Sequence, residues 1–229
     1  MQENIKNNHT LLIGTLASAV VLIFSLVFLI SAKSFSDQGS YIEVKGSSER
    51  IVKADVAIWN LSFDIKSNDI DELYSNIESS TAIINKFLKD KGFEDAEINI
   101  APVSIYQNSY KDALYLYNST TRLSVYTNKV DLVKTASKDT LNLIKKGVAL
   151  NMNDINFEFS DINSVKPAML AESIKNAKDT AKGFAKESGS GLGSAVRGNQ
   201  GVFDITEKDP GSPEYKKIRV VSTLRFLLK

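Results

Sequence analysis

The sequence predicts an α+β fold, in which a mixed, largely antiparallel sheet packs with about three helices and one N-terminal transmembrane helix precedes the domain. Segments with apolar residues at alternate positions, typical of half-buried strands, alternate with segments of helical apolar spacing. Short turns join several neighbouring strand segments, which favours antiparallel pairing over a doubly wound parallel sheet. A long uncharged apolar run lies near the N-terminus.

The apolar run covers residues 11–32. Roughly 20 helical residues span the hydrocarbon core of a bilayer, which is about 30 Å thick. We therefore predict a cytoplasmic tail at 1–10, a single membrane anchor at 11–32, a linker at 33–40 and one folded domain at 41–229 outside the cytoplasm. A cleaved signal peptide is the alternative, but its apolar region usually runs for only about 7–15 residues.

The first half of the domain predicts strands around one long helix. These elements are strands at 41–45 and 52–65 joined by a turn at 46–49, a helix at 70–91, and strands at 98–110 and 114–127 joined by a hairpin turn at 111–112. Trp59, Leu61 and Phe63 give the second strand an apolar face. Asp69 can cap the start of the helix, and Gly92 suits its end.

The second half predicts two more helices and three strands. These elements are helices at 130–146 and 167–188 and strands at 153–159, 196–205 and 218–228. We expect Pro167 in the first turn of the last helix, where its missing N–H costs little. Gly189, Gly191 and Gly193 follow that helix, so they predict a C-terminal cap and not a dinucleotide-binding loop, whose glycines precede a helix.

The last helix has a stripe of small residues. Ala177, Ala181 and Ala185 recur at every fourth position, which lets a helix lie close to a sheet. We place three larger apolar residues on the same face: Leu170, Ile174 and Phe184. Lysines on the opposite face are interpreted as solvated, although a basic stripe can also contact lipid headgroups or nucleic acid.

Composition excludes several kinds of chemistry. The chain has no cysteine, and its one histidine, His9, precedes the apolar run. Disulfides, cysteine nucleophiles, histidine-dependent triads and Cys or His metal sites are therefore absent from the domain. The net charge of +1 gives no long-range attraction to nucleic acid. We predict no catalytic residue, no cofactor, no metal site and no nucleic-acid partner.

Four tyrosines gather around the predicted hairpin: Tyr106, Tyr110, Tyr115 and Tyr117. Tyrosine combines a large apolar ring with a polar hydroxyl, and it is enriched at protein interfaces. The four residues are our candidate contact surface for a second copy of the chain. The alternative is that they only flank the edge of a strand.

Three segments resemble, in order, the SIMPL domain, also called the DUF541 or YggE-like family of bacterial envelope proteins. They are residues 44–57, with VKGSSE and then VKADVA; residues 88–104; and the alanine stripe that leads into Gly189 and residues 192–193. The resemblance covers about 41–228, and Ala54 stands where family members often have proline. It implies an α+β protein of the periplasm or envelope, with a role in oxidative-stress defence and, in some members, ring-like homo-oligomers. It implies no catalytic residue.

Together these observations favour a non-enzymatic, self-associating protein of the bacterial inner membrane, with its domain in the periplasm or outside the cell. One alternative is a ligand-binding or sensory ectodomain that works with a membrane partner, its small-molecule ligand unknown. Another is a hydrolase of an envelope polymer, which needs two carboxyl groups about 5–10 Å apart across a cleft.

Overall fold

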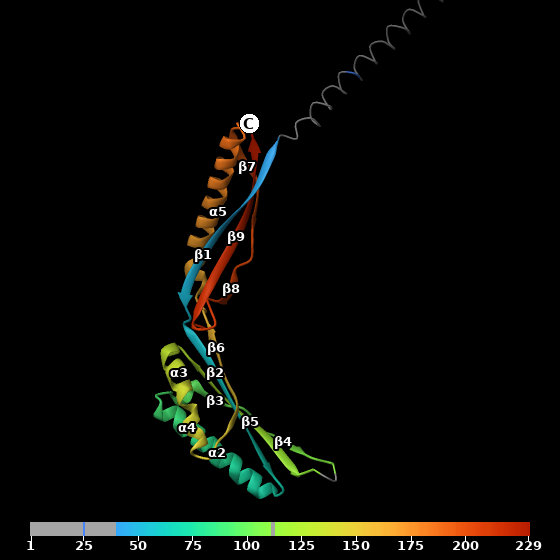
Figure 1. Ribbon diagram of the computed structural model, residues 1–229, viewed down its shortest axis with the longest axis vertical. Coiled ribbons are helices and arrows are strands. Elements are labelled where there is room, and N and C mark those ends of the chain that lie inside the picture. Colours follow the sequence, from blue (N-terminus) through green and yellow to red (C-terminus); the bar gives the residue numbers. More distant parts are fainter. Residues whose placement is uncertain (1–24, 26–39, 111–112) are drawn as a thin grey trace, which may run out of the picture. The chain divides into compact units, whose positions relative to one another are not determined.

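The computed structural model describes Ser25 and residues 40–110 and 113–229 (Figure 1). The predicted tail, membrane anchor and linker lie outside these residues, apart from Ser25 and Ser40. Among the helices that the described residues form, none is both long enough and apolar enough to cross a membrane.

Two antiparallel sheets and several helices confirm the α+β fold class. One sheet has the order β1-β9-β7, with β8 paired to β9, and the other has the order β3-β5-β2-β6, with β4 paired to β5. The strands are β1 (Tyr41–Lys53), β2 (Val56–Ser67), β3 (Ile98–Ile100), β4 (Ser104–Gln107), β5 (Tyr117–Thr127), β6 (Leu150–Glu158), β7 (Leu192–Gln200), β8 (Asp204–Glu207) and β9 (Tyr215–Leu228). The main helices are α2 (Ile70–Asp90), α3 (Val130–Ala136), α4 (Leu141–Ile144) and α5 (Ile162–Glu187).

By its internal contacts, the chain divides into two compact units. Among the described residues, the terminal unit consists of those up to Gly46, Ile174–Gln200 and Ser222–Lys229. The central unit consists of Ser47–Ser173 and Gly201–Val221.

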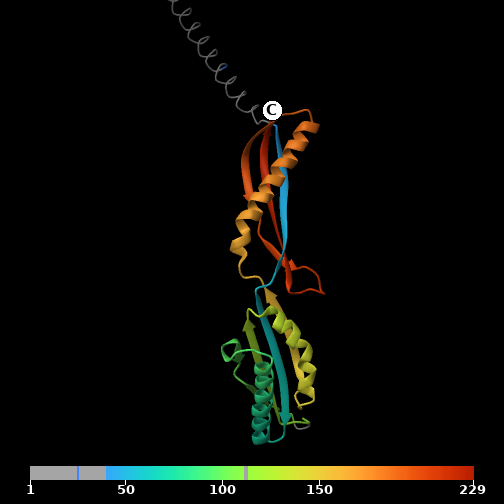
Figure 2. The same ribbon diagram turned by 90° about the vertical axis from the view of Figure 1, so that its left-hand side faces the viewer.

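In the central unit, α2, α3 and α4 lie on one face of the β3-β5-β2-β6 sheet (Figures 1 and 2). The predicted apolar face of β2 is confirmed, because Trp59, Leu61 and Phe63 are all buried in the core beneath these helices. The predicted ends of the long helix are confirmed too. The Asp69 carboxylate accepts hydrogen bonds from the first turn of α2, and Gly92 has a φ of +98°, a conformation that glycine adopts without strain.

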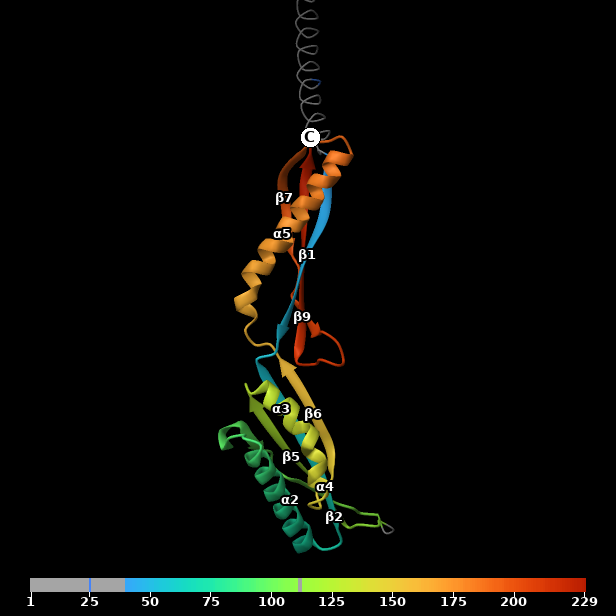
Figure 3. The same ribbon diagram turned by 60° about the vertical axis from the view of Figure 1, so that its left-hand side comes forward.

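In the terminal unit, α5 lies along its sheet (Figure 3). Ala177 and Ala181 are fully buried against Val44 and Phe226, which confirms the predicted contact of the small-residue stripe. After α5, Gly189 has a φ of +69° and β7 follows, so the predicted cap is also confirmed.

Of the three larger apolar residues that we placed with the alanines, Leu170 is partly buried against the cluster of Met169, Ile218 and Val220, but the other two do not share the buried face. Ile174 and Phe184 are each about half exposed, which corrects our prediction for them. The buried positions of the helix follow a strict four-residue step from Met169 to Ala185, so residues three positions from an alanine fall beside the contact. Because the alanines bring α5 close to the sheet, only one residue in each helical turn lies in the contact between them.

The predicted turn at 46–49 is wrong, because β1 continues through these residues. Its alternation persists: Val44, Gly46 and Ser48 all lie on the buried side. The Ser48 hydroxyl donates to Glu172 Oε2 at 2.8 Å, which satisfies a polar group in this buried position. β1 ends at Lys53, and Ala54 and Asp55 separate it from β2, which belongs to the other sheet.

Other predicted boundaries also shift. The strand predicted at 98–110 is two short strands, β3 and β4, on either side of Pro102, which has no N–H for a ladder. The helix predicted at 130–146 is α3 and α4 joined by a 3-10 turn, Ser137–Thr140. Helix α5 begins five residues before Pro167, because Ile162 and Val165 pack on the cluster of Met169, Ile218 and Val220. The strand predicted at 196–205 is divided between β7 and β8.

Candidate functional site: an aromatic hairpin

The four predicted tyrosines do lie on one hairpin of the central unit, formed by β4, β5 and the loop between them. Tyr106 is 63% exposed and Tyr110 is 84% exposed, whereas Tyr115 and Tyr117 are only partly exposed. Leu114, which the sequence places simply at the start of a strand, is 79% exposed on the same loop. Large apolar side chains this exposed on a single hairpin are a candidate contact surface.

The strand register separates Tyr117 from the other tyrosines. Tyr106 is opposite Asn118, and Asn118 is opposite Lys66 on β2, so these three share one face of the sheet. Tyr117 is opposite the buried Ser67 and therefore points to the face that the helices cover. We define the aromatic surface as Tyr106, Tyr110, Leu114 and Tyr115.

Two asparagines hold the backbone of the loop. Asn108 Nδ2 donates to the Tyr115 carbonyl at 2.6 Å, and the Asn108 N–H donates to the Leu116 carbonyl at 2.8 Å. Asn68 directly follows β2. Its Oδ1 accepts a hydrogen bond from the Leu116 N–H at 2.8 Å, and its Nδ2 donates to the Leu114 carbonyl at 3.4 Å. These bonds hold the backbone at Asn108 and at residues 114–116, from which Leu114 and Tyr115 emerge.

A cavity of about 590 Å³ lies beside the loop. Its lining residues are Lys66, Asn108, Tyr110, Ala113, Leu114, Tyr115 and Asn118. Among the residues that the structure describes here, which do not include 111–112, the lining offers aromatic rings, amide groups and one ammonium group, and no carboxylate. Such a set suits non-covalent binding.

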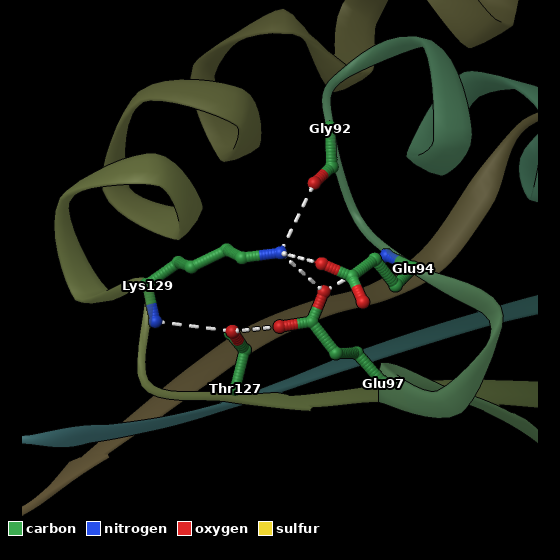
Figure 4. Close-up of polar contacts among 5 residues, drawn as sticks. All are labelled: Gly92, Glu94, Glu97, Thr127 and Lys129. Atoms are coloured by element: carbon green, nitrogen blue, oxygen red, sulfur yellow. Dashed lines mark hydrogen bonds and ion pairs between the residues drawn. The ribbon is translucent and has the colours of Figure 1, made fainter.

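A second polar feature of the central unit is the cluster around Lys129 (Figure 4). Lys129 Nζ lies 2.8 Å from Glu97 Oε2 and 3.1 Å from Glu94 Oε1, and it donates to the Gly92 carbonyl at 3.3 Å. The Thr127 hydroxyl donates to the other Glu97 oxygen and accepts the Lys129 backbone N–H at 3.0 Å. The cluster joins the end of α2 to the start of α3.

The ionised forms of Glu97 and Lys129 are stabilised in this cluster, which does not favour proton transfer between them and a substrate. Burial alone would raise the pKa of Glu97, but hydrogen bonds from the Glu94 N–H, Lys129 and Thr127 outweigh burial, so this pKa lies below its usual range. Hydrogen bonds to Glu97 and Glu94 raise the pKa of Lys129. A general acid needs the opposite shift, a raised carboxyl pKa. The cluster is a structural ion network.

Replacing Glu97 by glutamine is expected to lower the free energy of unfolding at pH 7 by about 1–2 kcal/mol. The folded pKa of Glu97 is below its ordinary value of 4.5, so the contribution of the carboxylate is present above that value. It is lost as pH falls through the lowered pKa. Urea unfolding followed by circular dichroism from pH 7 to pH 3 should show the gap between wild type and Glu97→Gln closing below about pH 5.

Glu94→Gln is the matched control, because the Glu94 side chain is 75% exposed while that of Glu97 is 16% exposed. An exposed ion pair contributes at most about 1 kcal/mol. A stability gap for Glu97→Gln that stays constant down to pH 3 would contradict the prediction.

Comparison with known proteins now identifies the family. Residues 42–220 match SIMPL, described as "Protein of unknown function (DUF541)". The chain belongs to the SIMPL family. The match confirms the predicted resemblance, and it runs from β1 into β9, with the aromatic hairpin inside it and the predicted anchor before it. No protein with a curated description matches the chain.

Two solved structures from Listeria innocua resemble this SIMPL chain, one described as a hydrolase and one as an uncharacterized conserved protein. Each is 16% identical to it, and each comparison covers 80% of this chain and 92% of the other. Their TM-scores are 0.25 and 0.23. Likeness at this level carries no inference about the activity of the SIMPL chain.

Proposed function

We propose that this SIMPL-family chain is a non-enzymatic protein of the cell envelope that self-associates through the aromatic surface of its central unit. The observation that carries the proposal is the exposure of Tyr106, Tyr110 and Leu114 on one hairpin. Covering such side chains removes apolar area from water, at roughly 25 cal/mol per Å². Tyrosine is also a frequent hot spot of protein interfaces.

A second copy of the chain is the proposed partner. The net charge of +1 leaves copies with little mutual repulsion. The apolar run at 11–32 supports an anchor in the bacterial inner membrane, with the domain in the periplasm or outside the cell. Anchoring confines copies to one plane, which raises their effective concentration and favours a weak contact. A role in envelope or oxidative-stress defence is part of the proposal.

For three of the buried or half-buried carboxylates, the direction of the pKa shift agrees with the absence of catalysis in this proposal. Glu97, Glu214 and Asp55 are held in the charged form by hydrogen bonds that outweigh burial, so the pKa of each carboxyl is lowered. A polymer hydrolase needs one carboxyl that stays protonated near neutral pH.

The test is the mass of the full chain in a non-ionic detergent, measured by size-exclusion chromatography with light scattering. We expect a wild-type oligomer. The double variant Tyr110→Ser, Leu114→Ser should need a protein concentration roughly tenfold higher or more for half-association, because it removes two large interface side chains.

Tyr126→Ser is the matched control. Tyr126 is 61% exposed, close to the value for Tyr106, and it lies opposite Ile58 at the other end of β5. The control should associate like wild type. A wild-type monomer at high concentration, or equal association of the hairpin variant, would overturn the proposal.

A second candidate function is ligand binding by an ectodomain that works with a membrane partner. The cavity of about 590 Å³ beside Tyr110 and Tyr115 favours it, because pockets for small molecules occupy a similar volume, roughly 300–1,000 Å³. A ligand that binds only the folded chain raises its melting temperature. A screen of envelope metabolites that leaves the melting temperature unchanged would count against this candidate.

A further inference from the structure

The terminal unit contains a polar pocket on the face of its sheet that points away from α5. Val44 and Phe226 point toward the alanines of α5, so their neighbours Glu43, Lys45 and Arg225 point to the opposite face. Arg197 on β7 is directly opposite Arg225 on β9 and shares that face. With Asn199 and Thr223, these side chains line a cavity of about 580 Å³.

The charges in this pocket are not balanced. Arg225 is compensated, because its Nη2 lies 2.9 Å from Glu43 Oε2 and its guanidinium lies 4.3 Å from the centre of the Tyr41 ring. Within the part of the chain that the structure describes, Arg197 and Lys45 have no acidic partner within 4.0 Å. Three cations and one carboxylate therefore leave the pocket with a net charge of +2.

The opposed arginines are the unusual element. Like charges directly opposite each other on neighbouring strands destabilise a sheet. Glu43 relieves only one of the two, since both short contacts to its Oε2, at 2.9 and 3.3 Å, come from Arg225. A second anion beside Arg197 and Lys45 would relieve the other.

We propose that this pocket binds the phosphate group of a small polar molecule. A phosphomonoester carries about −1.5 to −2 charges at pH 7, which matches the uncompensated charge of the pocket. A single carboxylate carries only one negative charge, so it would leave half of the pocket's positive charge unneutralised. A guanidinium fork fits phosphate oxygens with two parallel hydrogen bonds. Asn199 and Thr223, opposite each other in the register, add neutral donors.

Glycerol 3-phosphate and inorganic phosphate are the probes, titrated into the full chain in a non-ionic detergent and followed by calorimetry. We expect saturable binding of glycerol 3-phosphate that is about tenfold weaker or more in both Arg197→Ala and Lys45→Ala. Arg197→Lys keeps the charge but loses the fork, so an intermediate affinity is expected. Inorganic phosphate that binds as tightly as glycerol 3-phosphate would make the free ion the ligand, and weaker binding would favour an organic phosphate.

Arg122→Ala is the matched control. Arg122 is an exposed arginine on β5 of the central unit, outside the pocket, and its removal changes the net charge by the same amount. Its affinity for glycerol 3-phosphate should equal that of wild type. Absence of saturation in wild type, or equal weakening in Arg122→Ala and Arg197→Ala, would overturn the proposal. Self-association through the aromatic surface is measured separately and does not depend on this result.

Discussion

Replacing Trp59 by alanine should destabilise the central unit by about 3–5 kcal/mol, the largest effect that we expect from a single substitution. Trp59 is fully buried and meets Phe87 and Phe93 edge-to-face, with ring centroids 6.5 and 5.9 Å apart. Its Nε1 also donates to Asn153 Oδ1 at 2.8 Å, which ties β2 to β6. Alanine would leave a cavity between these aromatic rings and the sheet.

Urea unfolding of the full chain, followed by far-ultraviolet circular dichroism, measures this loss. Trp59→Phe separates packing from hydrogen bonding: it keeps an aromatic ring but leaves Asn153 without its donor, and it should cost only about 1–3 kcal/mol. If Trp59→Ala cost no more than Trp59→Phe, the aromatic packing would not be the main source of stability at this site.

Replacing Ala181 by leucine is expected to destabilise the terminal unit by about 1–3 kcal/mol. Ala181 is fully buried between α5 and its sheet, in a cluster with Val44, Ala177 and Phe226. A larger side chain here must push the helix away from the sheet or adopt a strained rotamer. The same urea experiment measures the change.

Phe184→Ala is the control for this substitution. Phe184 lies on the same helix but is about half exposed, so its truncation should change the free energy of unfolding by only about 0.5 kcal/mol. A Phe184→Ala loss larger than that of Ala181→Leu would show that the exposed flank of α5, and not the alanine stripe, holds the helix in place.

Local signals made parts of this fold predictable. Helix α2 could be predicted with both ends because its cap is a short-range interaction: Asp69 bonds within its own first turn, and Gly92 needs only its own positive φ. The alternation of Trp59, Leu61 and Phe63 likewise reports one strand and one buried face.

Long-range partners explain what the sequence alone could not supply. The stretch at 46–49 has the composition of a turn, but Ser48 finds its acceptor in Glu172, which is 124 positions away in the chain, and the strand continues. The early start of α5 depends on Ile218 and Val220 of β9 in the same way. Such partners are visible only once the chain is folded.

The candidate site was predictable only in part, because local clustering is visible in the sequence but strand register is not. Clustering of tyrosines placed the aromatic surface on the right hairpin, but the register of β4 and β5 decides which face each ring takes, and this register turns Tyr117 inward. The phosphate pocket escaped prediction altogether, because the opposition of Arg197 and Arg225 arises from strand pairing. Leu114 was missed because aliphatic residues at the start of a strand are usually buried.

The amides that hold the aromatic loop have a thermodynamic consequence for any partner. Asn68 and Asn108 already bond the backbone at Leu114, Tyr115 and Leu116, so these residues lose little conformational freedom when a surface docks on them. Ordering a flexible loop residue costs about 1–2 kcal/mol, which must be subtracted from the energy of contact. Preorganisation of residues 114–116 avoids most of this cost for that part of the surface, so even a small aromatic contact there retains useful affinity.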